Sequence, residues 1–350
     1  MSPGFLSEPS CTVTNVTSGY REKLENLGGS PLSPLAQSAY SSRGREEEEP
    51  EDDLMTPFVR DRDRIVHSKA FRRLGHKTQV FLAPEGDHYR VRLTHTLEVT
   101  QVARTIARAL GLNEDLVEAV CLGHDLGHTP FGHLGEEVVA DFLPGFRHNL
   151  QSVRIVETLE RLNLTWEVRD GIANHTWSMP VPSTLEGQIA RFADRIAYLN
   201  HDIDDAVRAG VLAESDLPPE TIKVLGETHS ERVATMVRDL VSASRDASEI
   251  KMTDEVFDAM SVTRSFLFER VYLGRVAPAT RDAVGRILET LLQHYSEWPG
   301  SIPEREVEGA PDEDSRVRAV DYVAGMTDRF AIRAFENLVG APSPPFGALG

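Results

Sequence analysis

The chain has 350 residues, of which 26% are charged and 40% are hydrophobic, and its formal net charge is −18. These fractions exclude collagen-like and wholly disordered proteins, and the length allows one large domain or two ordinary ones. The acidic balance argues against binding of nucleic acid or anionic membranes over the whole surface, but not against a local basic pocket.

The first 53 residues differ in composition from the rest of the chain. They are rich in Ser, Gly, Pro and Thr, show no hydrophobic periodicity, and end in an acidic run over residues 46–53. Such a composition predicts a largely flexible N-terminal segment whose acidic run is a solvated linker. Arg43 and Arg45 form a small basic island inside it.

From residue 54 onward the spacing of apolar residues is helical. The stretch 64–74 is near helical spacing, and 76–92 contains turn residues between two short β-prone pieces, which predicts a loop or a small hairpin. Gly111 ends the next helix, 94–110, and Asn113 caps the one after it, 114–125. Further helical patterns cover 149–162, 167–175, 184–209, 219–244, 251–273, 278–296 and 313–338.

Strand signals are almost missing, so the sequence predicts an all-α protein. We expect residues 54–240 to form the catalytic core. Residues 241–350 would form a C-terminal helical region that packs on this core and ends in a flexible tail.

The segment 121–136 is dense in groups that bind metals or transfer protons. Its His124-Asp125 pair offers an imidazole and a carboxylate to one cation, a mixture that suits borderline or hard divalent metals. Such dipeptides arise by chance in many chains, so the pair alone would favour an ordinary surface dipeptide at a helix end.

Two residues elsewhere change that interpretation. His95 opens an apolar helix, and Asp194 lies beside the apolar stripe of another, where a carboxylate is costly to bury unless it is paired or binds metal. The order His, His-Asp, Asp on successive helices resembles the signature of the HD phosphohydrolase superfamily. We therefore predict that His95, His124, Asp125 and Asp194 hold one divalent ion and leave positions for water and phosphate oxygen.

Several separated blocks resemble more narrowly the deoxynucleoside triphosphate triphosphohydrolases of the dGTPase type. They are residues 57–81, 123–133, 174–176, 198–206 and 321–331, and the resemblance covers roughly residues 40–338. It implies an HD-domain helical fold and a closed homo-oligomer, since hexamers are common in the family. It also implies hydrolysis of a dNTP to the deoxynucleoside and inorganic triphosphate, by metal-activated attack of water on the α-phosphorus. Mn²⁺ or Mg²⁺ is the favoured ion, with Co²⁺, Fe²⁺, Ni²⁺ or Zn²⁺ as alternatives.

Three residues of the same segment are candidates for catalysis. His133 and Glu136 share a helix face, so the carboxylate can orient the imidazole as a general acid for the leaving 5′-oxygen. The resemblance implies the same pair. His128 could meet a phosphate. The alternative for His133 and Glu136 is a solvated pair on the surface, and the alternative for His128 is a structural role as a hydrogen-bonding histidine.

Substrate residues follow mainly from the resemblance. Arg92 matches a family phosphate contact, and His148 matches an active-site histidine. Tyr198 matches the tyrosine that packs on the deoxyribose, and Asp202 the aspartate that binds its 3′-hydroxyl.

Three further residues complete the candidate substrate site. Asn174 and His175 could join the pocket, with a buried polar pair as an equal alternative. Arg64 belongs to a basic cluster that could bind phosphate or single-stranded DNA, with salt bridges to nearby acidic residues as the alternative. The other members of this cluster are Arg60, Arg62, Lys69, Arg72, Arg73 and Lys77.

Location and partners are the remaining expectations. No apolar run approaches the ~20 residues of a membrane span, and the N-terminus lacks a signal-peptide pattern. Cys11 and Cys121 are too few for a disulfide scaffold, so we expect a cytoplasmic protein. A regulatory second nucleotide is a further candidate partner. The rival functions are another HD phosphohydrolase, such as a nucleotidase or phosphodiesterase, and a non-catalytic HD protein that binds nucleotides or nucleic acid.

Overall fold

A computed structural model of the chain describes residues 32–79, 90–273, 278–303, 314–344 and 346. The predicted all-α class is confirmed, because regular structure over these ranges is helical and the only extended pairing is one antiparallel bridge between Thr78 and Val91. The bridge lies where the sequence predicts a loop or hairpin, whose middle falls outside the described residues. None of the described helices is both long and apolar enough to cross a membrane.

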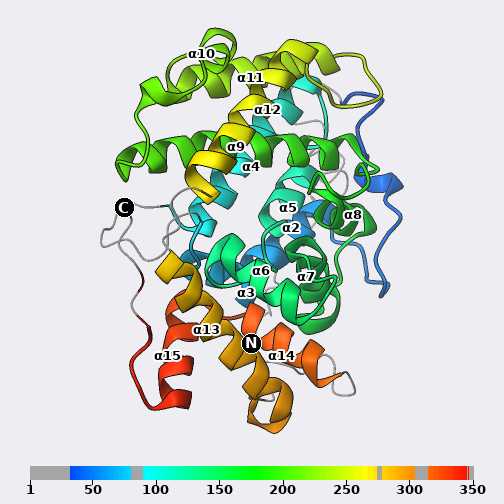
Figure 1. Cartoon of the computed structure of the whole chain (residues 1–350). Helices are drawn as coiled ribbons and strands as arrows, with labels where there is room; N and C mark the ends of the chain where they lie inside the picture. Colours follow the sequence, from blue (N-terminus) through cyan, green and yellow to red (C-terminus); the bar gives the residue numbers. More distant parts are fainter. Residues whose placement is uncertain (1–31, 80–89, 274–277, 304–313, 345, 347–350) are drawn as a thin grey trace, which may run out of the picture.

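Helices follow one another along the chain with short connections (Figure 1). The α-helices are α2 (Pro57–His67), α3 (Lys69–Arg73), α4 (Arg92–Leu110), α5 (Glu114–Gly123), α6 (Gly132–Phe142), α7 (His148–Arg154), α8 (Trp166–Asn174), α9 (Leu185–Arg208), α10 (Pro219–Leu225), α11 (His229–Ser244), α12 (Asp254–Leu267), α13 (Pro278–Glu297), α14 (Ser315–Ala324) and α15 (Asp328–Val339). Single 3-10 or π turns join several of them.

The central helices α4, α5 and α9 pack against one another around the main apolar core. Ile106, Val120 and Ile196, one from each helix, are fully buried, and each such side chain contributes about 1.5–3 kcal/mol by leaving water. The C-terminal end of α4 and the N-terminal end of α5 agree with the sequence prediction. Gly111 ends α4 in the left-handed region (φ 67°), and the Asn113 side chain accepts hydrogen bonds from the first turn of α5.

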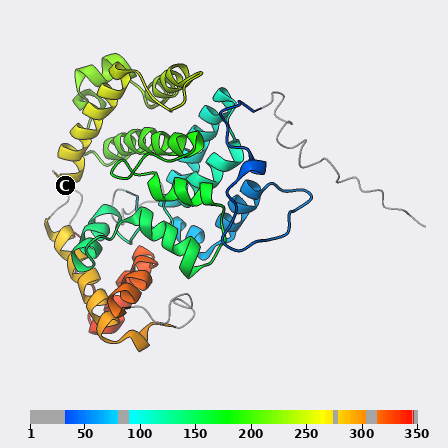
Figure 2. The same cartoon turned by 90° about the vertical axis from the view of Figure 1, so that its right-hand side faces the viewer.

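A second apolar core joins α13, α14 and α15 to α6. Figures 1 and 2 show these three C-terminal helices at one end of the molecule and α10 and α11 at the other. The helices α10 to α12 belong to the main core, so the domain boundary that we predict at residue 240 falls inside α11. We propose that the two regions divide between α12 and α13.

Two predicted helices are each divided in the structure. The stretch 219–244 breaks at Gly226 (φ 111°), after which Thr228 and Glu231 form a capping box for α11. The stretch 313–338 breaks after Gly325, where the Thr327 side chain caps α15. Apolar periodicity continues across both breaks, which explains why spacing alone does not reveal them.

Part of the N-terminal segment lies on the core, although composition predicts it to be largely flexible. The backbone N–H of Gln37 donates to Glu186 at 3.0 Å, and the Ser42 hydroxyl donates to Glu167 at 2.7 Å. The Arg45 guanidinium pairs with buried Asp61. Buried carboxylates of the core therefore hold residues 37–45 in place, while residues 1–31 lie outside the described ranges.

Candidate metal centre and active site

The four predicted metal ligands converge from two helices and one turn. His95 comes from the first turn of α4, Asp194 from the middle of α9, and His124 and Asp125 from the turn that directly follows α5. The Nε2 atom of His95 lies 3.2 Å from Oδ1 of Asp194. The Nε2 atom of His124 lies 3.6 Å from Oδ1 of Asp125 and 3.8 Å from Oδ1 of Asp194. Ligand atoms that share an ion at about 2.0–2.2 Å lie roughly 3–3.5 Å apart. The distance from His95 to Asp194 lies in this range and the two distances from His124 are slightly longer, so small movements would let the four groups share one divalent cation.

The hydrogen bonding of His124 also fits a metal ligand. Its Nδ1 donates to the carbonyl oxygen of Cys121 at 2.6 Å, which places the lone pair on Nε2. This Nε2 is buried and has no hydrogen-bond partner in the described part of the chain. A buried acceptor aimed at two carboxylates is costly unless a cation lies between them. The donor set of two imidazoles and two carboxylates suits a borderline or hard divalent ion.

Charges around Asp125 and Asp194 keep both ionised. Burial alone would raise their pKa values, but nearby imidazoles, together with Arg92 in the case of Asp125, hold both well below the usual range. Nη1 of Arg92 donates to Oδ2 of Asp125 at 2.7 Å, and this leaves Oδ1 toward His124. Arg92 is itself buried, so the predicted phosphate contact also orients a ligand.

A second group of histidines lies beside the metal centre around Glu136. Oε1 of Glu136 accepts hydrogen bonds from Nδ1 of His148 at 2.8 Å and from the His148 backbone N–H at 2.9 Å. Its Oε2 lies 3.8 Å from Nδ1 of His133 and 3.9 Å from Nε2 of His128. The His128 and His148 rings stack at 4.6 Å. The structure therefore brings together all three predicted catalytic residues, but Glu136 contacts His148 more closely than His133.

Hydrogen bonding makes His148 a partly buried imidazolium. Burial alone would lower its pKa, but the adjacent Glu136 carboxylate raises it above the usual value. Its Nε2 lies 3.2 Å from Nε2 of His175, whose Nδ1 donates to the Ile172 carbonyl oxygen at 2.8 Å. His175 therefore accepts at Nε2, and burial lowers its pKa to about 3. The charge of His148 is present below this raised pKa and is lost as the pH rises through it.

One face of α9 continues from Asp194 to the predicted sugar-binding residues. Tyr198 and Asp202 follow it at intervals of four residues, which keeps all three on one side of the helix. Tyr198 is half-buried, whereas Asp202 is buried and its Oδ1 has no partner among the described residues. Burial raises the pKa of Asp202 well above the usual value. A buried carboxyl oxygen without a partner is ready to bind a ligand hydroxyl.

Two arginines near this face are not predicted from the sequence. Arg191 and Arg195, both on α9, place their guanidinium groups over the ring of Trp177, at 4.7 Å and 3.8 Å. Each has a buried Nε without a partner in the described part of the chain. A signal exists in the sequence, because Arg195 directly follows Asp194 inside an apolar helix. A cation next to a metal ligand is suited to phosphate.

Two predicted substrate residues have other partners in the structure. The Arg64 guanidinium donates to Glu49 and to the carbonyl oxygens of Leu162 and Asn163. The side-chain amide of Asn174 donates to Asp170 at 2.9 Å. These contacts hold the N-terminal segment and the end of α8, so we do not include Arg64 or Asn174 in the proposed site.

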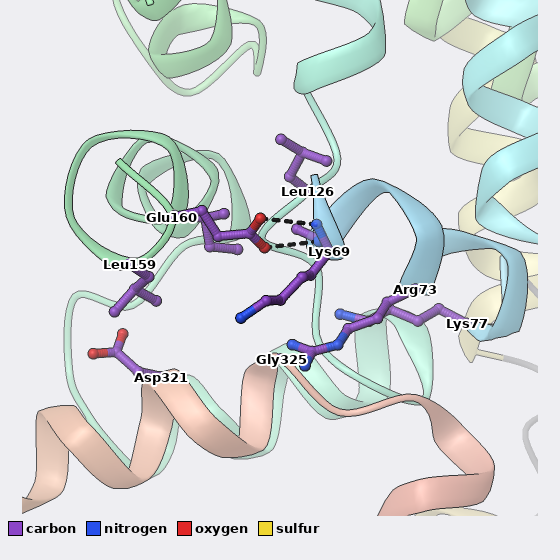
Figure 3. Close-up of a pocket in the computed structure, with 10 residues that line it drawn as sticks. Lys69, Arg73, Lys77, Leu126, Leu159, Glu160, Asp321 and Gly325 are labelled. Carbon is purple, nitrogen blue, oxygen red and sulfur yellow. Dashed lines mark hydrogen bonds between the residues drawn. The ribbon is translucent and has the colours of Figure 1, made fainter. Parts of the chain in front are cut away.

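The basic cluster of residues 60–77 is not one surface. Arg60 pairs with Glu49 and Arg62 with Asp63, as the salt-bridge alternative requires. Lys69, Arg73 and Lys77 instead line a pocket between α3 and α14, whose walls also include Glu160 and Asp321 (Figure 3).

Of the three basic residues that line this pocket, Lys77 is the buried one. It donates to the carbonyl oxygens of His128 and Ala324. Burial, together with the charge of Arg73, lowers its pKa to about 7. Lys77 thereby joins the segment between α5 and α6, which contains His128, to the end of α14.

Comparison with known proteins finds families and individual proteins that this chain resembles. The HD domain family matches residues 92–199, and the phosphohydrolase-associated domain family matches residues 250–337. A deoxyguanosinetriphosphate triphosphohydrolase-like protein of Caldanaerobacter subterraneus subsp. tengcongensis is 54% identical, over 93% of this chain and 97% of its own length. A protein of the same description from Clostridium perfringens is 47% identical, over 91% and 97%. A crystal structure of a hypothetical protein from Aquifex aeolicus aligns with a TM-score of 0.44 and 21% identity, over 80% of this chain and 70% of that one.

Proposed function

The chain belongs to the deoxyguanosinetriphosphate triphosphohydrolase-like family of metal-dependent HD-domain hydrolases, and we propose that it converts a dNTP to the deoxynucleoside and inorganic triphosphate. The observation that carries this proposal is the convergence of two imidazole Nε2 atoms and two carboxylates beside a partly buried imidazolium and a buried arginine. Such a centre can hold a cation and a polyphosphate together.

The ligand set His95, His124, Asp125 and Asp194 would hold the ion. When bound, a divalent ion supplies a Lewis acid for phosphate oxygens and lowers the pKa of a coordinated water. We assign Mn²⁺ or Mg²⁺ as the favoured ion, because half of the donors are carboxylates.

The chain's own residues would perform the remaining steps. The positive charges of His148 and Arg92 face the space beside Asp125, where they would stabilise the negative charge on the triphosphate and on the α-phosphoryl oxygens as water attacks and the P–O5′ bond breaks. His133, in the first turn of α6, would deliver a proton to the departing 5′-oxygen. Glu136 would hold both His133 and His148 in orientation.

Product analysis in ¹⁸O-labelled water tests the reaction. We expect free triphosphate, with the label in the triphosphate and none in the deoxynucleoside, because water attacks phosphorus and the P–O5′ bond breaks. The assay is mass spectrometry of both products, from each dNTP and NTP with Mn²⁺, Mg²⁺ and Co²⁺, singly and in pairs. Label in the nucleoside would mean carbon–oxygen cleavage. Stepwise release of monophosphate would favour the rival nucleotidase, and no turnover of any nucleotide would favour a binding protein.

Preference for deoxyribose should depend on Tyr198. If its ring packs on C2′, a ribose hydroxyl clashes or stays unpaired, which costs roughly 1–3 kcal/mol, or about ten- to hundredfold in kcat/KM. Tyr198→Ala should therefore lower the dNTP/NTP ratio of kcat/KM for a matched pair of substrates. Tyr295→Ala, at a half-buried tyrosine of the other core, is the control. Equal weakening of both substrates by Tyr198→Ala would show that this residue only supports the fold.

The other expectations stay predictions. A regulatory second nucleotide is one of them: the pocket beside Lys77 is lined by three basic side chains but also by the carboxylates of Glu160 and Asp321. Binding of single-stranded DNA, the closed homo-oligomer and the cytoplasmic location are likewise predictions. The salt bridges of Arg60, Arg62 and Arg64 reduce the support for a DNA surface there.

A further inference from the structure

A line of polar groups extends from the candidate ligand His95 away from the metal centre. The Nδ1 atoms of His95 and His201 lie 3.5 Å apart, and their rings meet edge to face. Nε2 of His201 contacts the carboxylate of Glu98, which lies one turn after His95 on α4. Both histidines are buried. This line connects α4 and α9, the two helices that carry His95 and Asp194.

One arrangement of protons satisfies these contacts when Nε2 of His95 faces an ion. The His95 ring then carries its proton on Nδ1 and must donate it. An ionised Glu98 can only accept, so His201 donates from Nε2 and keeps a lone pair on Nδ1. His201 therefore accepts from His95. His124 shows the same logic with a simpler partner, since its Nδ1 donates to the Cys121 carbonyl oxygen.

The far end of the line is anchored. Arg90 lies just before α4, and its Nε is 3.2 Å from Oε2 of Glu98. The same guanidinium pairs with Asp205 on α9 at 2.9 Å. The ring of His229 stacks on His201 at 6.1 Å. Arg90 thus holds the Glu98 carboxylate from the segment before α4 and is itself tied to α9. The His201 ring is covered by His229 from α11.

We propose that His201 and Glu98 are positioning residues for the metal centre. They fix the rotation of the His95 ring and its tautomer, and they make its Nε2 lone pair a stronger ligand for the metal ion. The proposal rests on the proposed four-ligand centre. Neither residue contacts the substrate or the ion in this assignment.

Metal affinity tests the proposal without reference to turnover. Mn²⁺ is titrated into the metal-free protein, and the EPR signal of the free ion reports binding. His201→Phe keeps the ring volume but removes both nitrogens, so binding should weaken about 10- to 100-fold. Glu98→Ala changes a partly exposed side chain and should weaken binding less. The double variant should match His201→Phe, because Glu98 acts through His201. His201→Gln, whose amide oxygen can accept from His95, should recover part of the loss.

Two further variants make the outcomes distinguishable. Glu114→Ala removes a carboxylate at the start of α5 that pairs with Arg104 and Arg108, far along α4 from His95, and should leave Mn²⁺ binding unchanged. Asp125→Asn should weaken it strongly. Wild-type Mn²⁺ affinity in folded His201→Phe, or in Glu98→Ala, together with weak binding in Asp125→Asn, overturns the positioning role and leaves the metal centre intact. Normal Mn²⁺ binding in Asp125→Asn as well would overturn both the positioning role and the four-ligand metal centre.

Discussion

Asp125→Asn should lose the bound divalent ion and should lower activity by on the order of 10³-fold or more, because several kcal/mol of charge stabilisation depend on that ion. Oδ1 of Asp125 faces His124, while Oδ2 accepts from buried Arg92. Asparagine can still accept from Arg92, so the guanidinium keeps a partner. Alanine would leave a buried charge unpaired and could unfold the protein. Metal content by elemental analysis and initial rates with a dNTP are the measurements.

Asp321→Asn is the matched control for this prediction. Asp321 is another buried aspartate, and it pairs with Arg154 at 2.7 Å, as Asp125 pairs with Arg92 at 2.7 Å. The two variants should therefore lose similar amounts of folding free energy, measured by thermal melting. Only Asp125→Asn should lose the metal. Full metal content in Asp125→Asn would remove Asp125 from the ligand set.

The candidate ligand set could be predicted from the sequence because each of its residues leaves a local mark. His124 and Asp125 follow a short apolar helix that ends before a glycine-rich loop, and Asp194 interrupts an apolar stripe. His95 opens an amphipathic helix whose apolar residues form one buried stripe. The structure brings these four side chains together because α4, α5 and α9 share one core.

Pairings between distant segments could not be predicted in this way. Glu136 lies twelve residues before His148, and only the path of the chain from α6 to α7 brings His148 closer to it than His133. His201 and His95 are 106 residues apart and meet because α4 and α9 cross. The partner of Arg64 could not be predicted either, since helical spacing does not show that Glu49 lies within reach.

The catalytic proton is the subject of the last prediction. His148 donates from Nδ1 to Glu136 and from Nε2 toward His175, so both of its protons are committed to protein groups. It therefore serves as a fixed positive charge for the substrate. His133 is 68% exposed and has Nδ1 3.8 Å from Glu136, so a bound nucleotide can reach it. We assign the proton transfer to His133 and charge stabilisation to His148.

This division predicts different kinetic losses for the two histidines. His133→Ala should lower kcat by on the order of 10²–10⁴ while KM and metal content change little, because a general acid acts only in the transition state. His148→Gln should raise KM as well as lower kcat, since it removes a charge that the bound triphosphate also contacts. Glu136→Gln should lower kcat too, because the carboxylate orients both rings. His67→Ala, at an exposed histidine at the end of α2, is the control and should leave both constants unchanged. Wild-type kcat in His133→Ala, with a large loss confined to kcat in His148→Gln, would reverse the two roles.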